Sequence, residues 1–213
     1  MRTLQEIGKQ TNTDKSRHEY KGMSYLDIYE KHFESIRNDV KCFVEIGVLN
    51  GASLKMWEEY FPNAIIYGID IEPNCKQYES ERVKIFIGDQ NDDEFLKTIS
   101  QEIGKIDILL DDGSHITRHQ VNTFNHLYTN VSKKGYYVIE DLRNSYEEFN
   151  AQYNLRLIWP GMSHNKPEDD LKNYRTEFNS WIGDMVKKLD FHDNNFNLFG
   201  IYHYPMIVVF ENK

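Results

Sequence analysis

Two pairs of acidic residues follow apolar runs that are typical of buried β-strands. Asp111 and Asp112 end the run IDILLD and open the stretch DDGSH, and Glu140 and Asp141 end YYVIED. If these strands are neighbours in a parallel sheet, about 5 Å apart, the four carboxylates meet at one edge. Without a nearby Lys or Arg they repel one another, and protonation or a bound cation must relieve the repulsion. Oxygen ligands favour Mg²⁺ or Mn²⁺, so a divalent metal site is predicted.

His115 lies three residues after Asp112, close enough to share the site without binding the metal. An imidazole that titrates near neutrality can remove a proton from a substrate hydroxyl, so we expect His115 to act as a general base. Two alternatives stay open. Asp112 or Ser114 could cap a helix that starts near Ile116. His115 and His119, one helical turn apart, could bind zinc, without the Glu of the HExxH motif.

The stretch VEIGVLNGAS has the form E-x-G-x-x-x-G and precedes a helical pattern. Gly47 and Gly51 would let the backbone turn sharply and approach a ligand, and Ser53 could cap the helix. The spacing is not GxGxxG, which disfavours a loop that cradles a dinucleotide pyrophosphate. An ordinary strand-to-helix turn is the alternative interpretation.

The next two predicted strands also end in polar groups. Asp70 occupies the position at which an acidic side chain commonly accepts hydrogen bonds from ribose hydroxyls. The sequence GDQ, residues 88–90, could read an adenine edge. Three successive strand ends with ligand-capable groups favour a nucleoside-type cofactor over turn and cap chemistry alone.

Short β-rich runs alternate with helical patterns from residue 41 onward, as in βα units on a parallel sheet. Strands are predicted over 41–47, 64–70, 83–88, 106–111 and 136–141, and helices over 24–36, 52–61, 92–103 and 116–131. The runs NLFGIYHY and PMIVVFEN predict an antiparallel hairpin at the sheet edge. Residues 1–40 are interpreted as a helical extension on the substrate side. Residues 41–213 are the main domain, with 147–190 as a lid or insertion.

Composition limits the function classes. A chain of 213 residues fits one domain, and a net charge of -9 gives no basic surface for nucleic acid. No apolar run approaches the roughly 20 residues that span a bilayer, and the first residues lack the apolar core of a secretory signal. We therefore expect a cytoplasmic chain without a membrane partner. Cys42 and Cys75 are expected to be free thiols.

The E-x-G-x-x-x-G loop, the acidic ends of the second and third strands and the terminal hairpin resemble the class I S-adenosylmethionine-dependent methyltransferases. The resemblance implies a Rossmann-like α/β fold with a mostly parallel seven-stranded sheet and a C-terminal antiparallel hairpin. It assigns to the S-adenosylmethionine site Glu45, Gly47 and Gly51 around the methionine portion, Asp70 at the ribose, Asp89 near the adenine, and Ser53 and Asp111.

Four longer stretches narrow the resemblance. TDKSRHEY, VEIGVLNGASLKMWEEYFPNAIIYGIDI, IDILLDDGSHITRHQVNTFNHLY and GYYVIEDLRNSY resemble the metal-dependent sugar O-methyltransferases of macrolide pathways, of the mycinamicin and macrocin type, and overlap with cephalosporin hydroxylase-like chains. The match covers most of residues 11–146. It implies that Asp112, Glu140 and Asp141 bind Mg²⁺ or Mn²⁺ and that His115 is the base. The implied reaction moves a methyl group from S-adenosylmethionine to a hydroxyl of a sugar or glycosylated small molecule.

Two further functions stay open. The same metal site would serve a catechol or phenol acceptor, and a cofactor-binding subunit without turnover belongs to a different class. The partner is expected to be a small-molecule acceptor, and the sequence leaves open whether copies of the chain associate as a homo-oligomer.

Overall fold

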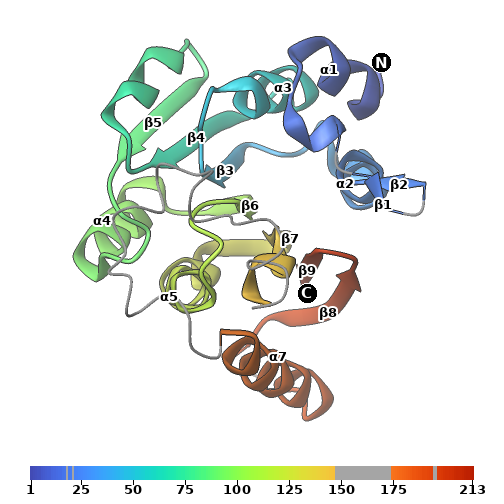
Figure 1. Ribbon diagram of the computed structural model, residues 1–213, viewed down its shortest axis with the longest axis vertical. Coiled ribbons are helices and arrows are strands. Elements are labelled where there is room, and N and C mark those ends of the chain that lie inside the picture. Colours follow the sequence, from blue (N-terminus) through green and yellow to red (C-terminus); the bar gives the residue numbers. More distant parts are fainter. Residues whose placement is uncertain (18, 21, 147–173, 194–195) are drawn as a thin grey trace.

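The computed structural model describes residues 1–213 except 18, 21, 147–173 and 194–195. A seven-stranded sheet has the order β5-β4-β3-β6-β7-β9-β8 (Figure 1). Its strands are β3 (Cys42–Ile46), β4 (Ile65–Asp70), β5 (Val83–Ile87), β6 (Ile106–Asp111), β7 (Val131–Ile139), β8 (Leu198–Tyr204) and β9 (Ile207–Asn212). β3 to β7 are parallel, whereas β9 pairs antiparallel with both β7 and β8. The predicted seven-stranded, mostly parallel sheet with a C-terminal antiparallel hairpin is confirmed.

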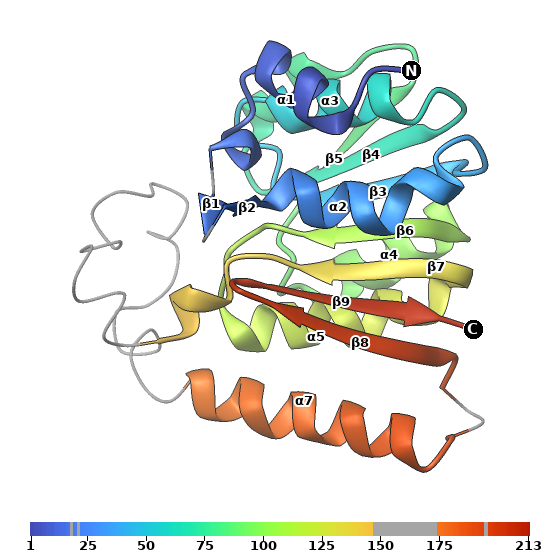
Figure 2. The same ribbon diagram turned by 90° about the vertical axis from the view of Figure 1, so that its right-hand side faces the viewer.

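Helices cover both faces of this sheet (Figure 2). They are α1 (Leu4–Thr11), α2 (Tyr25–Phe33), α3 (Ala52–Tyr60), α4 (Asp93–Ile103), α5 (Thr117–Leu127) and α7 (Tyr174–Asp190). Short 3-10 turns lie at η1 (Asp14–Ser16), η2 (Glu34–Ile36), η3 (Pro73–Tyr78), η4 (Tyr128–Asn130) and η5 (Leu142–Ser145). A small hairpin, β1 (Glu19–Tyr20) and β2 (Met23–Ser24), precedes α2.

Alternation along the strands creates two apolar cores. In β6, Ile108 and Leu110 join the core beneath α1, α2 and α3, and Leu109 joins the core beneath α4, α5 and α7. Successive side chains of a strand point to opposite faces, so a strand covered on both faces is apolar throughout. This explains why the runs that predicted the strands are continuous rather than alternating.

The boundaries differ from the prediction mainly at β7. This strand begins at Val131, because Val131 pairs with Ile106 ahead of an irregularity in the β6 ladder. The polar residues between Val131 and Tyr136 hid this early start. The helix predicted over 116–131 ends at Leu127 and continues as the 3-10 turn η4.

The interpretation of 147–190 as a lid or insertion stays a prediction. Residues 147–173 lie outside the described residues, whereas 174–190 form the helix α7, which packs against α5 and β8. Within the part of the chain that the structure describes, no helix has the length and apolar character to cross a membrane. Both cysteines are free thiols, as expected.

Candidate active site

The carboxyl ends of β6 and β7 lie side by side, so the two acidic pairs that follow these strands are neighbours, as predicted. Asp111 is paired with Ile139, and the backbone N–H of Glu140 donates to the carbonyl of Asp111 at 3.0 Å. On the other side, the N–H of Asp112 donates to the carbonyl of Ile46 at 2.9 Å, next to the loop after β3. The acidic stretch and the E-x-G-x-x-x-G loop therefore share one edge of the sheet.

Asp112, His115 and Asp141 form a group whose ligand atoms all lie within 4.8 Å of one another. His115 Nε2 is 3.6 Å from Asp141 Oδ2, and His115 Nδ1 is 4.0 Å from Asp112 Oδ1. His115 and Asp141 both have left-handed backbones, with φ of 59° and 56°. L-residues rarely adopt this conformation, and its cost is most often tolerated at functional sites.

One atom of this group has an unmet hydrogen-bonding requirement. His115 Nδ1 is buried and has no hydrogen-bond partner among the described residues. Buried polar atoms are normally paired, so the unmet requirement of His115 Nδ1 indicates that a group beyond the described residues completes the site. A hard cation held by carboxylate oxygens, with an acceptor hydroxyl near the imidazole, fits these donors and acceptors.

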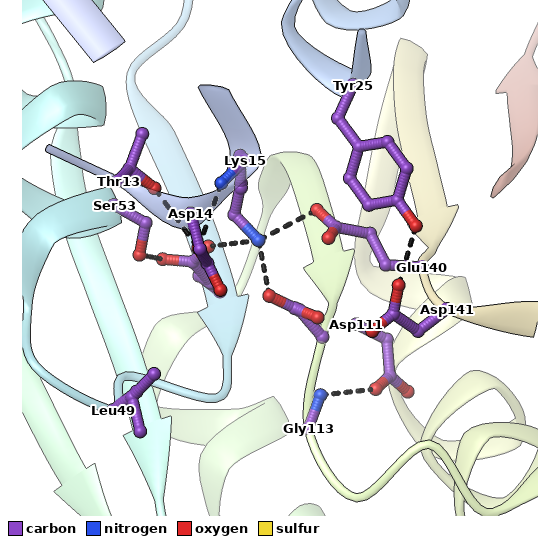
Figure 3. A network of polar contacts seen from close by, with 12 residues as sticks. Thr13, Asp14, Lys15, Tyr25, Leu49, Ser53, Asp111, Gly113, Glu140 and Asp141 are labelled. Atoms are coloured by element: carbon purple, nitrogen blue, oxygen red, sulfur yellow. Dashed lines mark hydrogen bonds and ion pairs between the residues drawn. The ribbon is translucent and has the colours of Figure 1, made fainter. Parts of the chain in front are cut away.

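Glu140 lies outside that group. Its Oε1 accepts hydrogen bonds from Lys15 Nζ at 2.9 Å and from the Tyr29 hydroxyl. Lys15, in η1, also donates to Asp112 Oδ2 and lies 3.5 Å from Glu45 Oε1 (Figure 3). Lys15 is 1% exposed and Glu140 2%.

The premise that no basic residue neighbours these carboxylates is therefore wrong. Lys15 and Asp112 are 97 positions apart, so their proximity could not be predicted from the order of the residues. The only signal was TDKS, a lysine in a polar stretch, and a lysine there is usually solvated. The prediction of Glu140 as a metal ligand is not tested by its contacts, since its second oxygen is not engaged by Lys15 or Tyr29.

The pKa values of Lys15, Glu45 and Glu140 are all raised by their surroundings. Burial raises the pKa of Glu140 well above its usual range, the Asp112 carboxylate raises it further, and Lys15 opposes both. Burial also raises the pKa of Glu45 to about 7 against the lowering effect of Lys15. Burial lowers the pKa of Lys15, but the carboxylates of Asp112, Glu140 and Glu45 outweigh it and the pKa is well above normal. The three carboxylates therefore favour the charged form of Lys15.

The loop after β3 is held by Asp70. Asp70 Oδ2 accepts from the N–H groups of Val48 at 2.8 Å and Leu49 at 3.1 Å, and Oδ1 accepts from the N–H of Glu72 at 2.9 Å. The carboxylate predicted to bind ribose therefore also fixes the turn. Its ribose role stays a prediction.

Two of the loop's predicted features have different causes. Gly47 has φ of 91°, and a Cβ there would lie 2.1 Å from the carbonyl oxygen of Asp112, so this glycine lets the β3 and β6 loops touch. Ser53 does not cap α3, because Gly51 is the N-cap. The Ser53 hydroxyl instead donates to Glu45 Oε2 at 2.6 Å, and Glu45 is fully buried.

Residues at the β5 end divide into two sets. Asp89 is exposed, and its Oδ1 accepts from the N–H of Asn91 at 2.8 Å. Gln90 is buried and cannot read an adenine edge as predicted, because its Nε2 donates to Asp111 and its Oε1 accepts from the Ser114 N–H. Asp111 is fully buried, and burial raises its pKa to about 6.

The contacts bear differently on the alternative interpretations of DDGSH. Ser114 Oγ accepts from the N–H of Ile116 at 3.3 Å, so Ser114 does contact the start of α5, as one alternative expected. The N-cap of α5 is Ile116, which has no side-chain cap, and the Asp112 carboxylate bonds Lys15. His119 is buried with Nδ1 2.9 Å from Ser114 Oγ, and burial lowers its pKa to about 4. Among the described residues, the group that could hold a metal ion consists of Asp112, His115 and Asp141, and it does not include His119.

Sequence comparison finds homologous enzymes that modify sugars. No family model matches the chain. An 8-demethyl-8-alpha-L-rhamnosyl tetracenomycin-C 2'-O-methyltransferase of Streptomyces olivaceus is 40% identical over 130 residues, covering 58% of this chain and 34% of the relative. A mycinamicin VI 2''-O-methyltransferase of Micromonospora griseorubida is 39% identical over 140 residues, covering 62% and 32%. The chain thus matches about a third of the length of these curated relatives.

Structural comparison agrees. The methyltransferase MycE of the mycinamycin biosynthetic pathway, solved in complex with Mg, SAH and mycinamycin VI, superposes with a TM-score of 0.77 at 28% identity. The superposition covers 99% of this chain and 54% of that one. The resemblance to sugar O-methyltransferases inferred from the sequence is confirmed at both levels.

Proposed function

We propose that this chain, which has the class I S-adenosylmethionine-dependent methyltransferase fold and is homologous to macrolide sugar O-methyltransferases, is a metal-dependent methyltransferase. It transfers a methyl group from S-adenosylmethionine to a hydroxyl of a sugar or glycosylated small molecule, and it requires a divalent metal ion. The observation that carries the proposal is the group of Asp112, His115 and Asp141 at the sheet edge.

Asp112 and Asp141, with Glu140 as the third predicted ligand, would hold Mg²⁺ or Mn²⁺. A divalent ion there would supply polarisation of the acceptor hydroxyl, which lowers the pKa of that hydroxyl. MycE is described in complex with Mg, which supports the same requirement in this chain.

His115 would accept the proton of the acceptor hydroxyl. An alcohol is a poor nucleophile until it is deprotonated, and a base within reach of it supplies that step. The buried Nδ1 without a partner and the nearby Asp141 carboxylate support this role, because the imidazole is held between two acceptors and can take a proton.

The loop between Gly47 and Gly51, Asp70 and Asp89 would bind the cofactor. The S-adenosylmethionine sulfonium supplies the methyl group. This binding is expected without metal, because the Asp70 contacts that shape the loop do not involve the acidic group.

The test is methyl transfer from labelled S-adenosylmethionine to a panel of rhamnosides and other glycosides with adjacent hydroxyls, with catechol as a separate arm. Metal-free protein should be inactive, and Mg²⁺ should restore transfer to the glycosides. Calorimetry should show S-adenosylhomocysteine binding before metal is added. Failure to bind the cofactor or its product, or metal-independent transfer, would contradict the proposal, and transfer to catechol alone would change the acceptor class.

A further inference from the structure

The segment before β3 supplies cationic and hydroxyl donors to the acidic edge. Lys15 donates to Asp112 Oδ2 and to Glu140 Oε1, and the Tyr29 hydroxyl donates to the same Glu140 oxygen. These contacts join residues more than 95 positions apart.

Tyr25 completes the pattern. Its hydroxyl donates to Asp141 Oδ1 at 2.6 Å, from the first turn of α2 (Figure 3). Each of the three carboxylates predicted as metal ligands therefore has one oxygen bonded by a side chain of residues 15–29.

The second oxygens of two of these carboxylates face the imidazole. Asp112 Oδ1 is 4.0 Å from His115 Nδ1, and Asp141 Oδ2 is 3.6 Å from His115 Nε2. In both Asp112 and Asp141, one carboxylate oxygen is hydrogen-bonded to the N-terminal segment and the other lies toward His115. A carboxylate that is hydrogen-bonded through one oxygen is restricted in rotation, so the segment sets the direction of the other.

The structure of α2 positions the hydroxyls of Tyr25 and Tyr29. Tyr25 and Tyr29 are four residues apart and lie on one face of the helix, so both hydroxyls can reach the end of β7. Ser24 and Asp27 form a capping box that fixes the start of α2, immediately before Tyr25. The Tyr29 ring packs against Phe33 and Trp57, with centroids 5.7 Å and 5.6 Å away.

We propose that Tyr25 is a positioning residue for the metal site, acting with Lys15 and Tyr29 to orient Asp141, Asp112 and Glu140 toward the ion. The inference rests on the proposed function and makes the N-terminal segment part of the site rather than a cover over it. Partners that orient metal ligands typically contribute roughly 10–100-fold to metal affinity or activity.

The test is Tyr25→Phe, which removes one hydroxyl and keeps the ring. Mn²⁺ affinity, followed by titration with electron paramagnetic resonance, should fall by roughly 10-fold. S-adenosylhomocysteine affinity without metal should not change. In the methyl-transfer assay the Mg²⁺ concentration for half activity should rise, with turnover at saturating Mg²⁺ largely recovered.

Tyr60→Phe is the matched control, because the Tyr60 hydroxyl is also buried but has no hydrogen-bond partner among the described residues. It should bind Mn²⁺ like the unmodified chain. Tyr29→Phe is a second variant and should weaken Mn²⁺ binding less, since Lys15 still bonds the same oxygen of Glu140.

The outcomes separate the inference from the proposed function. If the unmodified chain binds Mn²⁺ and Tyr25→Phe binds it as tightly as Tyr60→Phe, Tyr25 is structural and the inference is overturned. Parallel loss of Mn²⁺ and S-adenosylhomocysteine binding in Tyr25→Phe would indicate general disruption and would also overturn it. An unmodified chain that binds S-adenosylhomocysteine but no Mn²⁺ contradicts the metal-dependent function itself.

Discussion

His115 is the residue on which the chemistry depends most directly. Its imidazole lies between Asp112 and Asp141, and a base and a metal ligand would both fit that place. We expect His115→Asn to lower turnover by roughly 10²–10⁴-fold, the usual contribution of a positioned general base, with Mn²⁺ affinity retained. Asn is the suitable replacement because it tolerates the left-handed backbone of this position better than Ala does.

The decisive comparison is Mn²⁺ titration beside single-turnover rates. Loss of Mn²⁺ binding in His115→Asn would make the imidazole a ligand, and full turnover with the ion bound would remove it from the mechanism.

The contact between the loops after β3 and β6 determines how the DDGSH stretch lies relative to the loop that begins at Gly47. Gly47→Ala places a Cβ against the carbonyl of Asp112 and strains a φ of 91°, so it should move the DDGSH stretch. We expect a loss of unfolding free energy above about 1 kcal/mol and weaker binding of S-adenosylhomocysteine, measured by denaturation and calorimetry.

Gly104→Ala separates strain from collision. Gly104 has φ of 72° but no atom within 4 Å of its Cβ position, so this variant should lose stability through strain alone and keep cofactor affinity. Equal affinities of the two variants for S-adenosylhomocysteine would show that the loop contact is unimportant for the cofactor.

The packing of α2 on the terminal hairpin predicts a pH effect. His32 is buried beside Tyr136, Tyr202 and Tyr204, with Nε2 2.9 Å from the Tyr204 hydroxyl, and burial lowers its pKa to about 4. The neutral imidazole contributes stability above the unfolded pKa of about 6.5, and that stability is lost as pH falls toward 4. The wild-type chain should therefore lose up to about 2 kcal/mol from this group between pH 7 and 5.

His32→Gln keeps a hydrogen-bonding group and removes the titration. Its stability relative to the unmodified chain, from urea denaturation at pH 7 and pH 5, should improve on acidification. A difference that is independent of pH would mean that folding does not shift the pKa of His32, which would contradict the lowered value.

Lys15 connects the N-terminal segment to the sheet at the scale of the whole molecule. Lys15→Met leaves the buried Glu45 and Glu140 and the half-buried Asp112 without their cation, and breaking a buried ion pair in this way costs about 3–5 kcal/mol. For a chain of this length the unfolding temperature should fall by roughly 10 °C.

The loss should grow with pH. Without Lys15 the folded pKa values of these buried acids rise further above their unfolded values, so their protonated forms stabilise the variant at low pH and that stability is lost as pH rises. Thermal unfolding at pH 5.5 and pH 8 measures this. Lys9→Met, at an exposed position of α1, is the control and should change stability by less than about 0.5 kcal/mol. A loss in Lys15→Met that is equal at both pH values would contradict the electrostatic cause.

The sequence by itself determined the sheet, the hairpin and the edge at which the acidic residues meet. Continuous apolar runs such as IDILL predict strands buried on both faces. The carboxyl ends of parallel strands share one edge, so Asp112 and Asp141 lie close together once β6 and β7 pair. Both effects are local and periodic, and they can be read along the chain.

Tertiary structure alone decided which side chains satisfy those carboxylates. Lys15, Tyr25 and Tyr29 reach them only because α1 and α2 pack on one face of the sheet, and Ser53 and Gln90 turn inward because Glu45 and Asp111 are buried beside them. Contacts between residues about 100 positions apart have no period in the sequence, and burial, which fixes both partner and charge state, exists only after the chain has folded.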